Sequence, residues 1–256
     1  MGTNTKSRWF VGVSPGGNKS CALYAFPHAG AGSTAVRRLC TELADEFDTF
    51  GVRLPGRESR LSDPVETVMA ELADKLADEL VRHADGRPVV LYGHCAGSAI
   101  AYEVARRLDP AQLRGLAVSS HPAPGSIRRE PTWALPRADF LRQVETDGYL
   151  PPQILGNEEM LEIYEAVVRA DYELIETYEL ALFERGSVDP VSAPTVAVFS
   201  RDDHTMERAH IDAWSAFTTG PFQVVPLESG GHDLPGTQPV ELARAVRQGL
   251  KTGFSV

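Results

Sequence analysis

The pentapeptide Gly93-His94-Cys95-Ala96-Gly97 constrains the fold of this chain more than any other segment. It follows an apolar run over residues 88–92 and precedes a helical pattern over residues 98–108. A strand, a sharp turn flanked by small residues and a helix are the context of a nucleophile elbow, which lifts one side chain above a sheet. The raised side chain is predicted to be the thiol of Cys95, where this turn usually carries a serine. The segment therefore predicts acyl chemistry through sulfur.

Short apolar runs alternate with helical patterns along the chain, which predicts a mostly parallel sheet with helices on both faces. The predicted strands cover residues 22–26, 49–52, 89–92, 116–119, 195–200 and 223–227, with an additional edge strand at 10–13. The predicted helices between them cover residues 35–46, 67–83, 98–108, 207–217 and 240–250.

The region from Pro122 to Pro194 interrupts this alternation, because it contains a proline-rich loop and helical patterns but no convincing strand. Helices are predicted at residues 138–145, 158–169 and 172–183, where apolar residues recur at helical spacing. A helical insertion between two strands is expected to cover the carboxyl ends of the sheet, where active sites of open α/β sheets lie. We therefore predict one domain over residues 1–256 with a lid insertion at about residues 122–194.

The composition limits the class of protein. The chain has 256 residues and is 43% hydrophobic, enough for the core of one large domain. It carries 35 acidic and 25 basic residues, and a net charge of -10 argues against nucleic acid as the main partner. No signal-peptide core precedes Trp9 and no apolar stretch is long enough to cross a bilayer, so a soluble cytoplasmic protein is expected. The three cysteines have no metal-ligand spacing, so no metal site is predicted.

A nucleophile at an elbow needs a histidine base, which in this architecture comes last in the chain. His232 follows two glycines in a loop just beyond the strand predicted to end at Leu227, and it is our candidate. The side chain of His94 is expected to point away from the nucleophile, although it adjoins Cys95 in sequence.

The acid that orients the histidine is expected earlier in the chain than His232. Asp202 and Asp203 both follow the strand predicted at residues 195–200, and Asp203 is preferred with Asp202 as the alternative. The other position used by some hydrolases, after the strand ending near Ser119, offers His121 but no carboxylate. The lack of a carboxylate there favours an acid after the strand predicted at residues 195–200.

Backbone N–H groups are expected to stabilise the oxyanion. One donor is predicted at Ala96, directly after the nucleophile, and the other at Ala29 in the small-residue loop 27–32. Cys95 lies at a helix N-terminus beside a histidine, and both features favour the thiolate. Cys21 and Cys40 are predicted to be buried and unreactive.

These residues resemble the stand-alone type II thioesterases that accompany polyketide and nonribosomal peptide synthases. The likeness covers about residues 22–250, and its landmarks are the loop 26–30, the Pro-Gly-Arg stretch 54–61, the elbow, Gly230-Gly231-His232 and the segment 169–172. The resemblance implies an α/β-hydrolase fold with a helical lid. It also implies acyl substrates held as thioesters on the phosphopantetheine of an acyl or peptidyl carrier protein, with no metal or organic cofactor. No nucleic-acid or membrane partner is expected, and the protein is expected to be a monomer.

Cys95 departs from the serine that most members of this family carry. Transfer of an acyl group from a carrier thiol to a cysteine exchanges one thioester for another, so the acyl group keeps its activation. The cysteine is therefore compatible with hydrolysis, with acyl or aminoacyl transfer to a second acceptor, and with replacement of an original serine. A small-ester hydrolase of the dienelactone type and a non-catalytic binding protein are the remaining alternatives.

The acyl group is expected to contact residues of the elbow region and the lid. The lid residues form either an apolar tunnel or only the core of the lid. The candidate substrate-binding residues are His28, His94, Tyr149, Met160, Tyr164 and Tyr172.

Overall fold

The computed structural model describes residues 7–13, 19–128, 130–150, 152–154, 156–186 and 189–251. These residues form a seven-stranded sheet with the strand order β1-β3-β2-β4-β5-β6-β7. All neighbouring pairs are parallel except β1 and β3 at one edge. The strands are β1 (Phe10–Gly12), β2 (Ala22–Phe26), β3 (Asp48–Val52), β4 (Val89–His94), β5 (Leu113–Ser119), β6 (Thr195–Ser200) and β7 (Phe222–Leu227).

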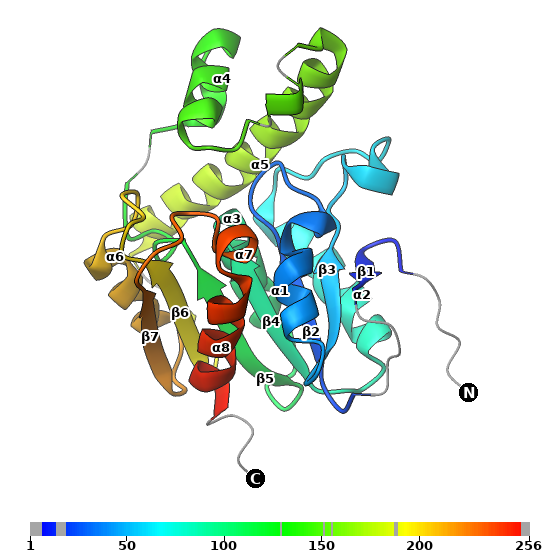
Figure 1. Cartoon of the computed structure of the whole chain (residues 1–256), viewed down its shortest axis with the longest axis vertical. Coiled ribbons are helices and arrows are strands. Elements are labelled where there is room, and N and C mark those ends of the chain that lie inside the picture. Colours follow the sequence, from blue (N-terminus) through cyan, green and yellow to red (C-terminus); the bar gives the residue numbers. More distant parts are fainter. Residues whose placement is uncertain are drawn as a thin grey trace.

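Helices cover both faces of the sheet (Figure 1). One face packs against α1 and α8, and the opposite face packs against α2 and α3. The strands between them are buried on both sides, as expected for a parallel sheet. These helices and the remaining elements outside the lid are η1 (Ser33–Val36), α1 (Arg37–Glu42), η2 (Glu58–Arg60), α2 (Met69–Ala84), α3 (Ala96–Ala105), α6 (Arg208–Asp212), η5 (Ala213–Phe217), α7 (Leu234–Thr237) and α8 (Pro239–Leu250), where η marks a 3₁₀ turn.

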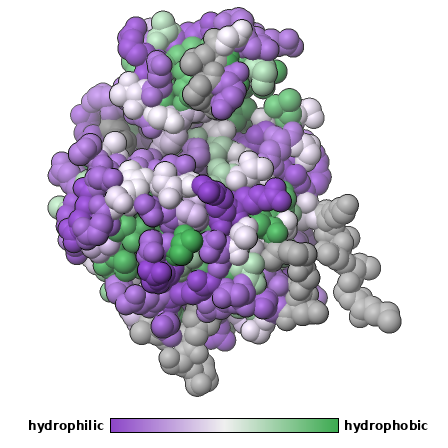
Figure 2. Space-filling view, in the orientation of Figure 1, coloured by the Kyte–Doolittle hydropathy of each residue, from purple (hydrophilic) through white to green (hydrophobic). Residues whose placement is uncertain are grey.

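This architecture confirms the predicted α/β class, and β2 and β6 have the predicted bounds. Two predicted helices differ in the structure. The helix predicted at residues 35–46 is replaced by η1 and a shorter α1 that ends at Glu42, and the one predicted at 207–217 is divided into α6 and η5. The face in Figure 2 is mainly hydrophilic, with small separate hydrophobic areas. Within the described ranges, no helix is both long and apolar enough to cross a membrane.

The lid lies between β5 and β6 and projects beyond the carboxyl end of the sheet (Figure 1). Its elements are η3 (Thr132–Ala134), α4 (Arg137–Thr146), η4 (Pro152–Ile154) and α5 (Glu158–Arg185). The prediction of two helices over residues 158–183 was wrong, because α5 is continuous. It begins at Asn157, whose side chain accepts from the N–H of Met160, and it ends at left-handed Gly186. No glycine or proline lies between the two predicted segments, so nothing in the sequence stops the helix there.

The turn between β4 and α3 has a left-handed conformation at Cys95, with φ 50° and ψ -127°. A non-glycine residue in such a region costs about 1–3 kcal/mol and needs support from its surroundings. Support comes from close packing at Gly97, where an added Cβ would lie 2.4 Å from the carbonyl oxygen of Phe26 and 2.5 Å from that of Pro27. The elbow therefore packs directly on the loop after β2.

We expect Gly97→Ala to destabilise the fold by about 2 kcal/mol or more, because the overlapping atoms are backbone and cannot rotate away. The measurement is the urea midpoint of unfolding. Gly156→Ala is the matched control, since nothing lies within 4 Å of its added Cβ. An equal effect of the two substitutions would show that the close packing at the elbow is unimportant.

Candidate active site

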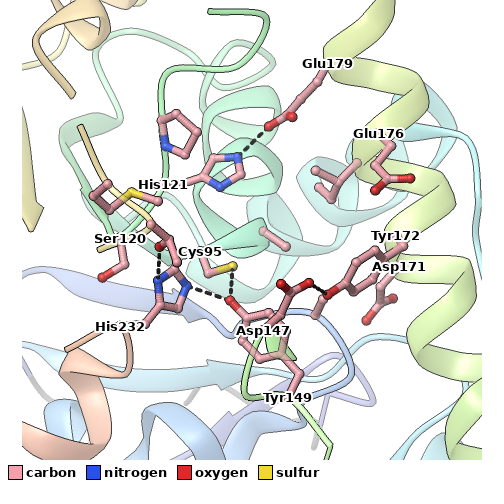
Figure 3. A pocket seen from close by; sticks show the side chains of 16 residues that line it. Cys95, Ser120, His121, Asp147, Tyr149, Asp171, Tyr172, Glu176, Glu179 and His232 are labelled. Atoms are coloured by element: carbon pink, nitrogen blue, oxygen red, sulfur yellow. Dashed lines mark hydrogen bonds and ion pairs between the residues drawn. The ribbon is translucent and has the colours of Figure 1, made fainter. Parts of the chain in front are cut away.

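Five loops meet at the carboxyl edge of the sheet, because parallel strands end at the same edge. They follow β2, β4, β5, β6 and β7 and place Ala29, Cys95, His121, Thr205 and His232 around one cavity. The lid supplies the opposite wall of this cavity through the loop after α4 and the middle of α5 (Figure 3).

Cys95, His232 and Asp203 are brought together in this cavity, with a tyrosine between the first two. Oδ2 of Asp203 lies 2.8 Å from Nδ1 of His232. Nε2 of His232 lies 2.6 Å from the hydroxyl of Tyr149, and this hydroxyl lies 2.8 Å from Sγ of Cys95 (Figure 3). The tyrosine hydroxyl thus contacts both the sulfur and the histidine.

Asp202 and Asp203 have different partners. Asp203 is buried and also accepts from the hydroxyl of Thr205 at 2.6 Å. Asp202 instead accepts from the N–H groups of Gly230 and Gly231, at 3.2 and 2.8 Å. Asp203 therefore orients the ring of His232, whereas Asp202 holds the glycine loop that precedes it.

The electrostatics of the site favour a thiolate at Cys95. Burial alone would raise the pKa of this thiol, but the neighbouring imidazoles of His121 and His232 favour the thiolate and hold the pKa well below its usual value. Burial also opposes the cation of His232, yet Asp203 and Cys95 raise its pKa to about 10. Cys21 and Cys40 differ, because burial raises the pKa of each to about 12.

A second histidine–carboxylate pair lies beside the sulfur and was missed in the sequence. His121 follows β5, and its Nε2 lies 2.8 Å from Oε1 of Glu179 in α5 (Figure 3). The available signal is the position of His121 at the carboxyl end of a strand, where the sequence offers a histidine and no carboxylate. Nothing local in the sequence could have paired His121 with Glu179.

The loop after β2 is fixed by a buried ion pair. Arg57 and Asp171 form two parallel hydrogen bonds of 2.8 Å, and both side chains are buried. Oδ2 of Asp171 also accepts from the N–H of Gly30 at 2.7 Å, and Arg57 donates to the carbonyl of Ala31 at 3.1 Å. This network joins the Pro-Gly-Arg stretch, lid helix α5 and the loop that carries Ala29.

Both predicted oxyanion donors line the cavity. Ala96 is the first residue of α3, so its N–H has no acceptor within the helix. Ala29 lies directly before Gly30, whose own N–H is taken by Asp171.

Only two of the six candidate substrate-binding residues line the cavity, namely Tyr149 and Tyr172. Three others support them or the elbow: His28 stacks on the ring of Tyr149, the Tyr164 hydroxyl donates to the Tyr149 carbonyl, and buried His94 contacts the Ser119 hydroxyl. Met160 lies outside the cavity and is 50% exposed, because it is in the first turn of α5, whereas the cavity is lined by the middle of this helix. Apart from the tyrosines, much of the lid wall is acidic, with Asp147, Asp171, Glu176 and Glu179.

No group of three or more His, Cys, Asp or Glu side chains among the described residues is arranged to hold a metal ion.

We expect Arg57→Ala to destabilise the protein by about 3–5 kcal/mol, because Asp171 would remain buried without its partner. Turnover should also fall, since the loop carrying Ala29 loses its support. Thermal unfolding and steady-state kinetics measure the two effects. Arg142→Ala is the control, because its pair with Asp139 is exposed and should contribute less than about 1 kcal/mol. Equal stability losses in the two variants would contradict the prediction.

Comparisons with known proteins agree with this arrangement. The family described as Thioesterase domain matches residues 22–249. The phenyloxazoline synthase MbtB of Mycobacterium tuberculosis is 32% identical over 223 residues, which are 85% of this chain, and the match spans only 15% of that relative's length.

Two solved structures are also similar over most of their length. The thioesterase RedJ, from the prodiginine pathway of Streptomyces coelicolor, is 28% identical with a TM-score of 0.78, covering 92% of this chain and 86% of its own. The type II thioesterase BorB, from the borrelidin biosynthetic cluster, is 28% identical with a TM-score of 0.80, covering 96% and 100%. With its parallel sheet, its elbow and a family match over residues 22–249, this chain belongs to the thioesterase domain family.

Proposed function

We propose that the protein is a thioesterase that releases acyl groups from the phosphopantetheine thioesters of carrier proteins in polyketide or nonribosomal peptide biosynthesis. The observation that carries the proposal is the left-handed Cys95 at a strand–helix elbow, facing the His232–Asp203 pair in a chain of this family. A covalent acyl-Cys95 intermediate follows from this arrangement.

The names of the similar proteins support the substrate class. RedJ and BorB come from the prodiginine pathway and the borrelidin cluster, and MbtB is a synthase. We infer from them that this chain meets an acyl or peptidyl carrier protein.

In the first half of the reaction, the Cys95 thiolate attacks the thioester carbonyl. The new C–S bond forms as negative charge moves to the carbonyl oxygen, which the N–H groups of Ala96 and Ala29 stabilise. Collapse of this intermediate breaks the bond to the carrier sulfur, which leaves with the proton of His232. The Tyr149 hydroxyl must first move aside, because it occupies the space between Sγ and Nε2.

In the second half, neutral His232 removes a proton from water as the water oxygen attacks the acyl carbon. Asp203 stabilises the imidazolium that forms. The C–Sγ bond then breaks, releasing the acid and regenerating Cys95. This mechanism uses side chains, backbone N–H groups and water, without a cofactor.

Acyl transfer to a second acceptor is the alternative function, and the sulfur of Cys95 is the observation that favours it. An acyl-cysteine keeps the free energy of the carrier thioester, so a thiol or amine can replace water as the attacking group. The same residues would serve both reactions.

Intact-protein mass spectrometry after mixing with an acyl-loaded carrier tests the proposal. We expect an acyl adduct that is absent in Cys95→Ala and decays to free acid, because Cys95 is the nucleophile. Turnover by Cys95→Ala at the normal rate would contradict the assignment. An empty second carrier separates the two functions: a lasting adduct that moves rapidly to this carrier would replace hydrolysis by transfer.

The two neighbouring aspartates provide a matched test of the acid. Asp203→Asn should lower kcat by about a thousandfold or more, because the ring of His232 loses its orientation and its counter-charge. Asp202→Asn should cost less than about tenfold, since the amide oxygen can still accept from the glycine loop. Steady-state kinetics on a carrier-bound acyl group measures both. The opposite order of effects would make Asp202 the acid.

A further inference from the structure

The position of His121 in the cavity is fixed by one unusual backbone conformation and two hydrogen bonds. The residue before it, Ser120, has a left-handed φ of 49°, one of four such non-glycine residues in the described part of the chain. The indole N–H of Trp214 donates to the His121 carbonyl at 2.9 Å. The N–H of Cys95 donates to the Ser119 carbonyl at 2.8 Å, so the turns that carry His121 and Cys95 are joined.

The side chains of His121 and Glu179 are both buried, with 7% and 3% of their surface exposed. Desolvating two charges costs several kcal/mol per ion, so a buried pair is weak evidence for a purely stabilising role. Titratable groups in a cleft whose pKa values are strongly shifted are instead typical of functional sites. The mechanism above uses neither residue.

The ring of His121 lies between the Glu179 carboxylate and the sulfur of Cys95 (Figure 3). Its Nε2 faces Glu179, and the ring lines the same cavity as the Cys95 sulfur. Although burial disfavours the imidazolium, Cys95 and Glu179 together raise the pKa of His121 above its usual value. The Glu179 carboxylate therefore stabilises the imidazolium of His121, as Asp203 stabilises that of His232.

The other titratable groups facing the sulfur cannot supply positive charge. Burial lowers the pKa of both His28 and His94, which keeps these two rings neutral. Burial and the charge of Cys95 raise the pKa of Tyr149, and burial with Asp147 raises that of Tyr172, so both phenols stay protonated. The cations at Cys95 are therefore His232 and His121.

We propose that His121, oriented by Glu179, is a second catalytic imidazolium that keeps Cys95 ionised independently of His232. His121 faces the reacting sulfur in the cavity (Figure 3), whereas Glu179 is a positioning residue that acts through His121. The proposal rests on the proposed function only in taking Cys95 as the nucleophile.

A second cation divides two tasks between two histidines. His232 accepts the proton of water, and His121 stabilises the thiolate of Cys95. When water attacks the acyl-enzyme, its proton goes to His232 and its oxygen bonds to the acyl carbon. The C–Sγ bond then breaks with both electrons going to sulfur, and Cys95 leaves as a thiolate beside protonated His121. The sulfur needs no proton from His232, which keeps the proton taken from water and gives it to the carrier sulfur in the next turnover.

Alkylation of Cys95 by iodoacetamide across a pH series tests the proposal without any acyl substrate. Intact mass gives the rate for the unmodified protein, His121→Asn, His232→Asn and the double variant. In His232→Asn we expect the pH midpoint to stay below the value of about 8.5 for a free thiol. His121→Asn should then raise it by about one pH unit or more in either background, because thiolate stabilisation is lost.

Glu179→Gln should raise the midpoint in the same direction but less than His121→Asn, since the ring remains. Cys95→Ala gives the background labelling, which should be small because Cys21 and Cys40 are buried thiols of high pKa. Circular dichroism checks that each variant folds. If His121→Asn does not fold, the ¹⁵N shifts of the His121 ring in unmodified protein provide the test, with double protonation at neutral pH expected.

Unchanged midpoints in the His121→Asn and Glu179→Gln variants, or a neutral His121 ring at neutral pH, would overturn the proposal and leave this pair a structural link between sheet and lid. The proposed function fails by a different result, namely the absence of an acyl adduct on Cys95. Each can therefore fail without the other.

Discussion

The left-handed backbone of Cys95 is the constraint on which the rest of the site depends. It raises the sulfur above the carboxyl edge of the sheet and starts α3 with the free N–H of Ala96. This conformation is held because Gly97 allows α3 to pack against the carbonyl oxygens of Phe26 and Pro27. The same contact places the loop of Ala29 beside the elbow, so the proposed nucleophile and the proposed oxyanion donors depend on one piece of backbone packing.

Buried charge connects this rigid edge to the lid. Asp171 and Glu179 are both in α5, and each pairs with a cation from the sheet side, Arg57 and His121 respectively. Asp171 fixes the loop that carries the proposed oxyanion donor, whereas Glu179 reaches the sulfur through a histidine. Because buried pairs are costly to break, displacement of α5 would disturb both the oxyanion loop and the charge around Cys95. In the proposed mechanism the lid therefore contributes to the chemistry as well as covering the site.

Tyr149 gives the lid a third contact with the site, since its hydroxyl lies between Sγ of Cys95 and Nε2 of His232. The Tyr149 ring is supported by stacking on His28 and the backbone by the Tyr164 hydroxyl. A substrate must replace this hydroxyl with its own carbonyl and leaving group. In this structure the site is therefore closed, because the Tyr149 hydroxyl occupies the space between Cys95 and His232 that the substrate is proposed to enter.

Local sequence patterns were sufficient for the sheet, the elbow and the chain order of Cys95, Asp203 and His232. Alternation of apolar runs with helices predicts parallel strands, and parallel strands bring the ends of distant segments to one edge. The glycines around Cys95 and before His232 mark turns whose geometry depends mainly on neighbouring residues. These features follow from short-range sterics and periodicity, which a sequence displays directly.

Tertiary structure alone decided which side chains meet across the cavity. Asp202 and Asp203 are adjacent in the sequence. Only the path of the loop decides that Asp203 pairs with His232, whereas Asp202 accepts hydrogen bonds from the glycine loop. The pairing of His121 with Glu179 depends on the angle at which continuous α5 crosses the strand ends. Such contacts are set by the packing of whole elements and by the need to pair buried charges, and no local pattern in the sequence encodes them.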